Sequence, residues 1–150
     1  MEIKTNEMRI RSAEKKDMLT VYEQICELEE ISFDINVFQN IFYNNIIDKN
    51  KLYFLAENQI GDSLGFISCH IQYLLHHCGK VAEIQELFVK QEYRNKGIGA
   101  KLISHIEILL KELDCVSLEV TAQNKRIQTH LFYIKSEFTQ SHLKFTKNLK

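Results

Sequence analysis

The chain has 150 residues, of which 45% are hydrophobic and 26% are charged, a composition typical of a soluble globular domain rather than a disordered tail or a fibre. Its 19 basic and 20 acidic residues give a net charge of −1, which argues against a nucleic-acid-binding module because such modules need a basic excess. No apolar run reaches the roughly 18 residues of a membrane span, and the charged start predicts no signal peptide. We expect one domain over residues 1–150, cytoplasmic, without a nucleic-acid or membrane partner.

The four cysteines predict neither a disulfide scaffold nor a metal site. They are Cys26, Cys69, Cys78 and Cys115, and none belongs to a CxxC pair or to zinc-ribbon spacing. We expect reduced thiols, as is usual in the cytoplasm.

Hydrophobic periodicity predicts ten elements. Apolar residues that alternate with polar ones indicate strands, and apolar residues spaced by three and four indicate helices. In chain order these are a strand over 7–13, helices over 14–31 and 35–47, strands over 52–57, 64–75 and 81–89, a helix over 97–113, a strand over 115–121, a helix over 125–136 and a last strand over 143–145.

The second of these helices has a recognisable start. Asp34 is a plausible N-cap, because its carboxylate can accept the first free amides of the helix. We expect Val37, Phe38, Ile41 and Phe42 to face the core.

The order of elements predicts a mixed sheet. The three strands between residues 52 and 89 form an antiparallel meander, because short turns join them. The strand, helix and strand over residues 81–121 form a βαβ crossover, so its two strands are expected to be parallel.

A glycine-bearing turn precedes the helix over 97–113. It reads Arg94-Asn-Lys-Gly97-Ile-Gly99. The first amides of a helix lack intrahelical partners, and the helix dipole adds positive charge there, so the turn predicts a pyrophosphate site. Glycine lets the backbone approach such an anion closely. Leu102 stands where a dinucleotide fingerprint needs glycine, and no GK[ST] ending marks a P-loop.

With this turn, the sequence resembles the GCN5-related N-acetyltransferase (GNAT) superfamily over almost the whole chain. The family's acetyl-CoA motif is matched by Arg94, Gly97 and Gly99, with Asn95 where many members carry another glycine. The resemblance implies an α/β fold with a mostly antiparallel sheet, a V-shaped splay between two parallel strands, and flanking helices. It implies acetyl-CoA as cosubstrate. The implied binding residues are Leu87, Phe88, Val89, Arg94, Asn95, Lys96, Gly97, Ile98, Gly99, Ala100 and Asn124.

Acetyl transfer to an amine needs a base for the ammonium and benefits from an acid for the leaving thiolate. Strand alternation places Glu83 and Gln85 on one face and Glu86 on the other, unless a bulge intervenes. The family's base lies on this strand; the spacing to Arg94 matches Glu83 best, and Glu86 is the second candidate. Tyr133 aligns with the family's acid.

Several polar stretches resemble bacterial aminoalkylphosphonate N-acetyltransferases: His70–His77, Glu83–Leu87, His130–Tyr133 and Gln140–Lys147. This resemblance implies that a small aminoalkylphosphonate is acetylated on its amino group, and it links a divalent metal to the activity. A phosphonate needs cationic partners, which arginine supplies best as a bidentate donor. The candidate substrate-binding residues are His76, His77, Arg126, His142 and Lys144.

Other functions remain open from the sequence. The acceptor could instead be a polyamine, an aminoglycoside or a protein amino terminus, and the chain could bind CoA without turnover. Retention of Glu83 and Tyr133 argues against the last alternative. A homodimer is expected only by analogy with such folds.

Overall fold

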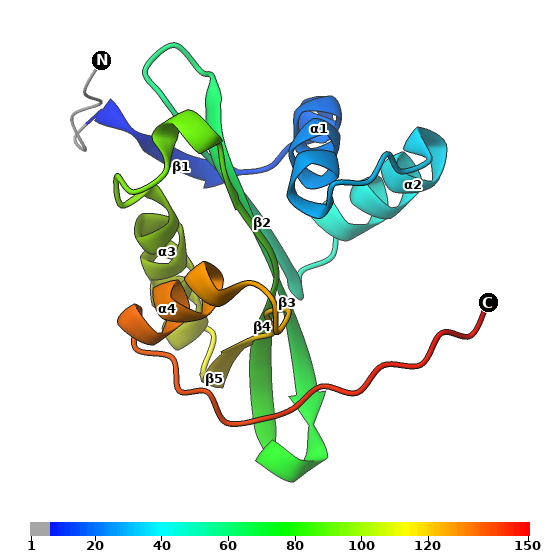
Figure 1. Cartoon of the computed structure of the whole chain (residues 1–150), viewed down its shortest axis with the longest axis vertical. Coiled ribbons are helices and arrows are strands. Elements are labelled where there is room, and N and C mark those ends of the chain that lie inside the picture. The colour runs from blue at the N-terminus through cyan, green and yellow to red at the C-terminus, as the bar shows by residue number, and fades with distance from the viewer. Residues whose placement is uncertain (1–6) are drawn as a thin grey trace.

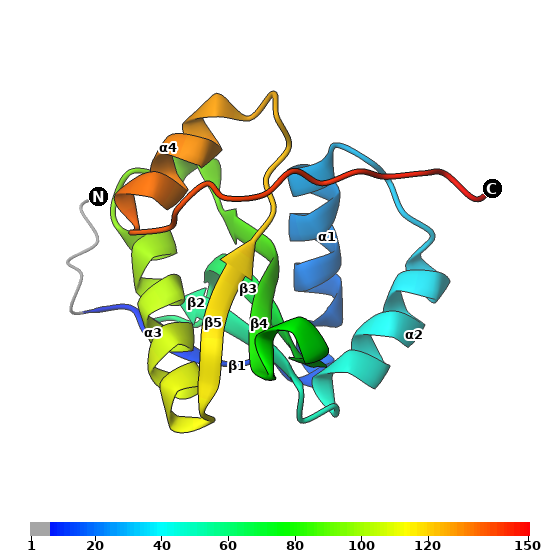
Figure 2. The same ribbon diagram turned by 90° about the horizontal axis from the view of Figure 1, so that it is seen from below.

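In the computed structural model, which describes residues 7–150, a five-stranded sheet lies between two layers of helices (Figures 1 and 2). The strands are β1 (Arg9–Ser12), β2 (Lys51–Glu57), β3 (Ser63–Leu74), β4 (Gly79–Val89) and β5 (Cys115–Val120), and the α-helices are α1 (Met18–Glu29), α2 (Ile35–Ile46), α3 (Ile98–Glu112) and α4 (Ile127–Lys135). Nine of the ten predicted elements are thus present, with bounds shifted by a few residues. No helix of this part of the chain is long and apolar enough to cross a membrane.

The strand order is β1-β2-β3-β4-β5, and only the β4–β5 pair is parallel. The predicted meander and the predicted crossover are therefore both confirmed. The crossover places α3 on one face of the sheet, while α1 and α2 cover the opposite face (Figure 2).

Two apolar clusters hold these layers together. The helix α3 buries Leu102, Ile103 and Ile106 at 2% exposure or less against one face of the sheet. On the other face, Val21 of α1 and Phe42 of α2 pack in a second cluster with strand residues. Burial of each such side chain contributes about 1.5–3 kcal/mol, so the two clusters fix which face of the sheet each helix covers.

The predicted inward face of α2 is partly wrong. Phe38 and Phe42 pack in the core, but Val37 and Ile41 are 57% and 54% exposed. The helix lies at the edge of the molecule, where it contacts α1 and β2. These neighbours cover only one side of the helix. The predicted cap is confirmed, since Asp34 Oδ1 accepts from the amides of Asn36 and Val37 at 2.9 and 3.1 Å.

The last predicted strand is wrong. Within the described chain, residues 138–150 form no strand, and Leu143 and Phe145 are 78% and 89% exposed. Their alternating pattern is that of a strand, but a strand needs a neighbour to accept and donate its backbone hydrogen bonds. No described segment of this chain lies in that position.

The end of α4 is shaped without the usual glycine. Glu137 adopts the left-handed conformation with φ 70°, and the amide of Phe138 donates to the carbonyl of Tyr133 at 3.0 Å. This closes the helix in the manner of a Schellman turn. It also places the ring of Phe138 edge-on to Tyr133, with the centroids 5.4 Å apart.

Candidate active site

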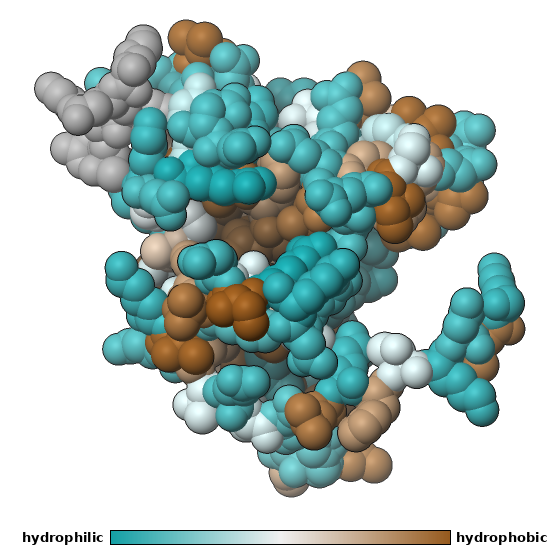
Figure 3. Space-filling model, viewed as in Figure 1, coloured by the Kyte–Doolittle hydropathy of each residue, from teal (hydrophilic) through white to brown (hydrophobic). Residues whose placement is uncertain are grey.

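The two parallel strands separate halfway along β4. Their register runs from Lys80 opposite Cys115 to Ile84 opposite Val120, where β5 ends while β4 continues to Val89. The remaining residues of β4 therefore lack a strand neighbour on that side in the described chain. Figure 3 shows the molecule hollowed here, with hydrophobic atoms on the floor, between the part that carries α1 and the part that carries α4. This is the expected V-shaped splay.

The turn before α3 has the geometry of an anion cradle. Asn95 and Gly97 adopt left-handed conformations, with φ 61° and 82°. The helix then begins at Ile98, and no side chain of residues 7–150 caps its first amides. These amides and the positive end of the helix dipole can bind a pyrophosphate. Arg94 instead shapes the turn, because its Nε donates to the carbonyl of Val89 at 2.8 Å.

The two glycines of the motif serve different purposes. A Cβ at Gly97 would meet no described atom within 4 Å, so this glycine is needed for its left-handed backbone. A Cβ at Gly99 would lie 3.2 Å from Cζ of Phe132. Gly99 therefore lets α3 and α4 approach each other.

A β-bulge places both candidate bases on one face of the sheet. Ser68 of β3 lies opposite Glu86, but the next residue, Cys69, lies opposite Ile84, so that Gln85 is the extra residue. Beyond the bulge Glu83 lies opposite His70. Since Ser68 and His70 share a face, Glu83 and Glu86 do too, which corrects the expected alternation.

Glu86 is a partly buried carboxylate with few compensating partners. Burial raises its pKa, the hydroxyl of Ser68 donates to Oε2 and opposes that rise, and the charge of Glu29 adds to it. The backbone amide of Glu86 donates back to the same Ser68 hydroxyl at 3.0 Å. A carboxylate whose pKa is raised binds a proton more strongly and is therefore a better base.

Tyr133 lies in the wall of the splay that α4 provides. It is 9% exposed, and Phe132 and Phe138 meet it edge-on. Burial raises the pKa of Tyr133 to about 12, although the charge of Arg126 opposes the rise. The phenol is therefore protonated at neutral pH and can act only as a proton donor.

Arg126 joins the two walls of the splay. It lies at the start of α4, and its guanidinium donates to the carbonyl of Leu28 at 3.3 Å, with Nη2 3.9 Å from Oε2 of Glu29. The Arg126 side chain thereby links the start of α4 to the end of α1. Asn124 lies in the turn between β5 and α4.

Two of the predicted histidines lie at the far end of the sheet face that carries Glu83 and Glu86. His76 and His77 are in the tight turn between β3 and β4, with their ring centroids 4.4 Å apart. His77 Nε2 is 3.5 Å from Oε1 of Glu119. Glu119 in turn pairs in register with Glu83.

His142 and Lys144 lie neither in the splay nor at the β3–β4 turn. Both lie in the exposed carboxyl-terminal segment. The five predicted substrate-binding residues are thus divided between the sheet end, the splay and this segment.

On the sheet face that carries Glu83 and Glu86, sequence reasoning missed the polar residues Ser68 and Glu119. It included His70 in a stretch that resembles the aminoalkylphosphonate enzymes but gave it no role. His70 stacks on Tyr53 at 6.2 Å, and its buried Nε2 has no hydrogen-bond partner among the described residues. The strand pairing was the signal that could have found them, because each lies directly opposite one of the two candidate bases.

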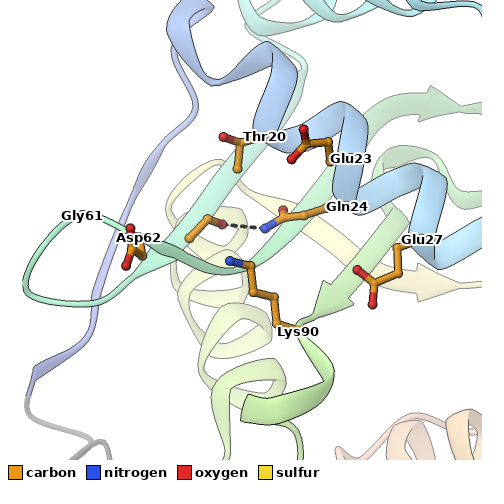
Figure 4. A pocket seen from close by; sticks show the side chains of 8 residues that line it. Thr20, Glu23, Gln24, Glu27, Gly61, Asp62 and Lys90 are labelled. Atoms are coloured by element: carbon orange, nitrogen blue, oxygen red, sulfur yellow. Dashed lines mark hydrogen bonds between the residues drawn. The ribbon is translucent and has the colours of Figure 1, made fainter.

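A separate polar cavity lies along α1, which lines it with residues from Thr20 to Glu27. It has a volume of about 280 Å³. In Figure 4, side chains of α1 face Lys90, which follows β4, and Gln24 Nε2 donates to Ser63 Oγ at 2.7 Å. None of the predicted site residues lines this cavity.

The described residues contain no group of three or more His, Cys, Asp or Glu side chains placed to hold a metal ion. The structure therefore lends no support to the metal that the resemblance links to the activity.

Comparison with known proteins decides the family. The sequence model of the acetyltransferase (GNAT) family matches residues 16–133, which is more than half of the chain. The chain belongs to this family. An aminoalkylphosphonate N-acetyltransferase of Salmonella typhimurium is 36% identical over 140 residues, covering 93% of this chain and 90% of that protein.

Solved structures agree on the fold. A protein of Bacillus halodurans described as a transcriptional regulator superposes with a TM-score of 0.85 at 20% identity, over 95% of this chain and 99% of that one. An aminoglycoside antibiotic 6'-N-acetyltransferase from Acinetobacter baumannii superposes at 0.81 with 21% identity, over 95% and 99%. The chain is thus a GNAT acyltransferase that acts on amines, and its family uses acetyl-CoA as cosubstrate.

Proposed function

We propose that this acetyltransferase transfers the acetyl group of acetyl-CoA to the amino group of a small aminoalkylphosphonate. The observation that carries the proposal is the 36% identity to the Salmonella typhimurium aminoalkylphosphonate N-acetyltransferase over 93% of the chain. The charges support it, because β4 carries carboxylates suited to an ammonium group and the start of α4 carries a guanidinium suited to a phosphonate.

In this proposal the splay holds the cosubstrate. The amides of residues 95–100 bind the pyrophosphate, with Lys96 beside them, and the free side of β4 at Leu87, Phe88 and Val89 aligns the pantetheine arm. Asn124 flanks the opening from the β5 side. The support is the uncapped helix start and the separation of β4 from β5, which together leave backbone donors and acceptors available.

The proposed reaction is a direct transfer. The ammonium of the acceptor gives a proton to a carboxylate of β4, and the neutral nitrogen attacks the thioester carbonyl carbon. The C–N bond forms, the C–S bond breaks, and the CoA thiolate takes the phenolic proton of Tyr133. The nitrogen loses its second proton as the amide forms, and this proton returns to the Tyr133 phenolate. A phenol with its pKa near 12 is protonated throughout the physiological range, as this role requires.

Two carboxylates compete for the role of base. The spacing to Arg94 favours Glu83, whereas burial and the raised pKa favour Glu86. We assign the role to Glu86, with Glu83 as the alternative. Glu83 accepts from Thr121 Oγ1 at 3.4 Å and faces Glu119 across the strands, so it can also attract the ammonium group.

We assign the phosphonate group to the basic side chains among the predicted substrate-binding residues. Arg126 spans the splay between α1 and α4, and His76 and His77 lie at the far end of the same face. His142 and Lys144 remain in the proposed substrate-binding set through the resemblance alone, since both lie in the exposed carboxyl-terminal segment.

The test measures thiol release from acetyl-CoA against a panel of amines, with and without divalent metal. The panel holds aminomethyl-, 1-aminoethyl- and 2-aminoethylphosphonate, a polyamine, an aminoglycoside and a peptide, and the Arg126→Ala variant serves as the comparison. We expect turnover on the phosphonates and a raised KM for them, with an unchanged KM for acetyl-CoA, in the variant. Turnover only on another amine would overturn the assignment of the acceptor. If no amine of the panel is acetylated although CoA binds normally, the proposed acetyl transfer is wrong.

A further inference from the structure

The polar cavity along α1 has an acidic wall. Glu23 and Glu27 lie one turn apart on the helix, and Asp62 adds a third carboxylate from the turn between β2 and β3 (Figure 4). Among the described residues that line the cavity, Lys90 alone is basic. Three carboxylates and one ammonium group leave the cavity with an excess of two negative charges, which favours a cationic ligand.

The carboxylates of this wall are not neutralised by the protein. In the described part of the chain, Glu23, Glu27 and Asp62 form no ion pair, and Lys90 forms none either. The acidic residues beside β1 differ in this respect, because arginine side chains bind them. The charges along α1 are therefore available to a ligand from solution.

A buried carbonyl oxygen favours the same kind of ligand. Gln24 is 3% exposed and lines the cavity between Glu23 and Glu27. Its Nε2 donates to Ser63 Oγ at 2.7 Å, and this hydroxyl donates to the carbonyl of Gly65 at 3.4 Å. The amide is thereby oriented, and its Oε1 has no hydrogen-bond partner among the described residues. An unpaired buried carbonyl is unfavourable, and only a hydrogen-bond donor can satisfy it.

The size and spacing of the cavity favour an organic ligand with two charges over a metal ion. No three metal-ligating side chains of the described residues are grouped to hold an ion, so these carboxylates do not converge on one point. The volume of about 280 Å³ lies near the lower end for small-molecule pockets. Side chains at i and i+4 of a helix lie roughly 5–6 Å apart, which matches the separation of two ammonium groups joined by three or four methylenes.

We propose that this cavity binds a small linear diamine, such as 1,3-diaminopropane or 1,4-diaminobutane, at a site separate from that of the acetylated amine. One ammonium group donates to Gln24 Oε1 and to a carboxylate of α1, and the other binds a second carboxylate of the wall. The two charges of the ligand match the excess negative charge. The site is separate because none of the residues assigned to catalysis or to the acceptor lines the cavity.

The first experiment measures binding of 1,3-diaminopropane to the unmodified chain by titration calorimetry at low salt, without acetyl-CoA. We expect one diamine to bind and n-propylamine, which has one charge, to bind more weakly. The double variant E23Q/E27Q should weaken the diamine roughly tenfold, as the loss of two ion pairs near the surface allows. The matched control is E107Q/E112Q, which removes two carboxylates from α3 and should leave binding unchanged.

Two results of this titration would overturn the site. One is the absence of binding to the unmodified chain at millimolar diamine. The other is an equal loss of affinity in E23Q/E27Q and E107Q/E112Q, which would show that the diamine responds only to the overall charge. Circular dichroism checks that each variant is folded.

Two further variants test the cavity itself by opposite changes in affinity. Lys90→Gln removes the like charge that opposes the ligand, so we expect tighter binding. Gln24→Met keeps the length of the side chain but removes its carbonyl oxygen, so we expect weaker binding. If Lys90→Gln fails to tighten the diamine, or Gln24→Met fails to weaken it, the ligand does not occupy this cavity.

A last pair of titrations separates this site from the acceptor site. The diamine is titrated into the Glu86→Gln variant, and into the unmodified chain with excess 2-aminoethylphosphonate, and we expect its affinity to be unchanged in both. A loss of affinity in either would place the diamine on the acceptor face of β4 and overturn the separate site. These measurements need no acetyl transfer, so they hold whichever amine is acetylated.

Discussion

A charge cluster at the amino-terminal edge and the two titratable groups of the candidate site, Glu86 and Tyr133, behave in opposite ways. At the amino-terminal edge, Glu57 accepts from Arg9 and from Arg11, and Arg11 donates to both oxygens of Asp17 at 2.8 Å. On the β4 face and in the splay, no arginine or lysine of the described residues is hydrogen-bonded to the half-buried Glu86 or to the buried Tyr133.

The pKa values reflect this difference. Burial works against ionisation of Glu57 and Asp17, but hydrogen bonds from the arginines outweigh it, and both pKa values fall. Burial prevails at Glu86 and Tyr133, and both pKa values rise. The first cluster is built to keep its charges and hold β1, β2 and the start of α1 together, whereas the second leaves proton affinity available for chemistry.

The largest effect should come from removing the base. We expect Glu86→Gln to lower kcat by about 10³-fold, within the usual range for general bases, with little change in the KM for acetyl-CoA. Steady-state kinetics measure this, with Glu83→Gln as the matched variant on the same face. A larger loss in Glu83→Gln than in Glu86→Gln would transfer the role of base to Glu83.

Substitutions in the amino-terminal charge cluster should instead change the stability of the protein and leave its turnover unaffected. Glu57→Gln leaves the arginines without their shared carboxylate, and breaking such a pair costs about 3 kcal/mol of unfolding free energy. Urea denaturation measures it, while kcat of the folded enzyme should be unchanged. The control Lys16→Met breaks an exposed pair with Glu14, whose side chain is 60% exposed, and should cost less than about 0.5 kcal/mol.

Tyr133→Phe should lower kcat by about 10²-fold, at the low end for a general acid because water can also protonate the thiolate. The ring packing against Phe132 and Phe138 is retained, so melting temperature and CoA binding should change little. Equal turnover in the variant would remove Tyr133 from the mechanism.

Stability should depend on pH in opposite directions for the two clusters. Lowered pKa values at Glu57 and Asp17 stabilise the fold above the unfolded values of about 4, and this stabilisation is lost as pH falls through the lower folded values. The raised pKa of Glu86 means that its contribution is full below the unfolded value and declines as pH rises through the folded one. Urea midpoints from pH 3 to 8 should show a shallower acid loss in Glu57→Gln, and equal or higher stability in Glu86→Gln at pH 7.

The smallest effect concerns Ser68. Its hydroxyl lowers the pKa of Glu86 against the effect of burial, so Ser68→Ala should move the acid limb of kcat to higher pH and leave the plateau nearly unchanged. A pH–rate profile measures this, with Ser117→Ala as the control, because that hydroxyl has no hydrogen-bond partner in the described chain. If the acid limb of the profile does not move in Ser68→Ala, the group that titrates in kcat is not Glu86.

Much of the fold was predictable because it depends on local signals. The left-handed turn at Asn95 and Gly97, the cap at Asp34 and the apolar stripe of α3 are each set within a few residues of chain. The free amides at the start of α3, on which the proposed cosubstrate site depends, were predictable for the same reason, since a helix start presents such amides whatever packs around it.

The geometry of the acceptor face was not predictable in this way. The bulge at Gln85 depends on how β4 pairs with β3, and one extra residue moves every later side chain to the other face. The exposure of Val37 likewise depends on how little of the molecule covers α2.

The sequence by itself determined the order of elements, the parallel crossover and the glycine turn before α3, because periodicity, capping and glycine conformation are short-range properties of the chain. Only the tertiary structure decided that Glu83 and Glu86 share a face, that Arg126 joins α4 to the end of α1, and that residues 143–145 find no strand within the described chain. These features depend on partners distant in sequence, and strand register and side-chain reach exist only once those partners are in place.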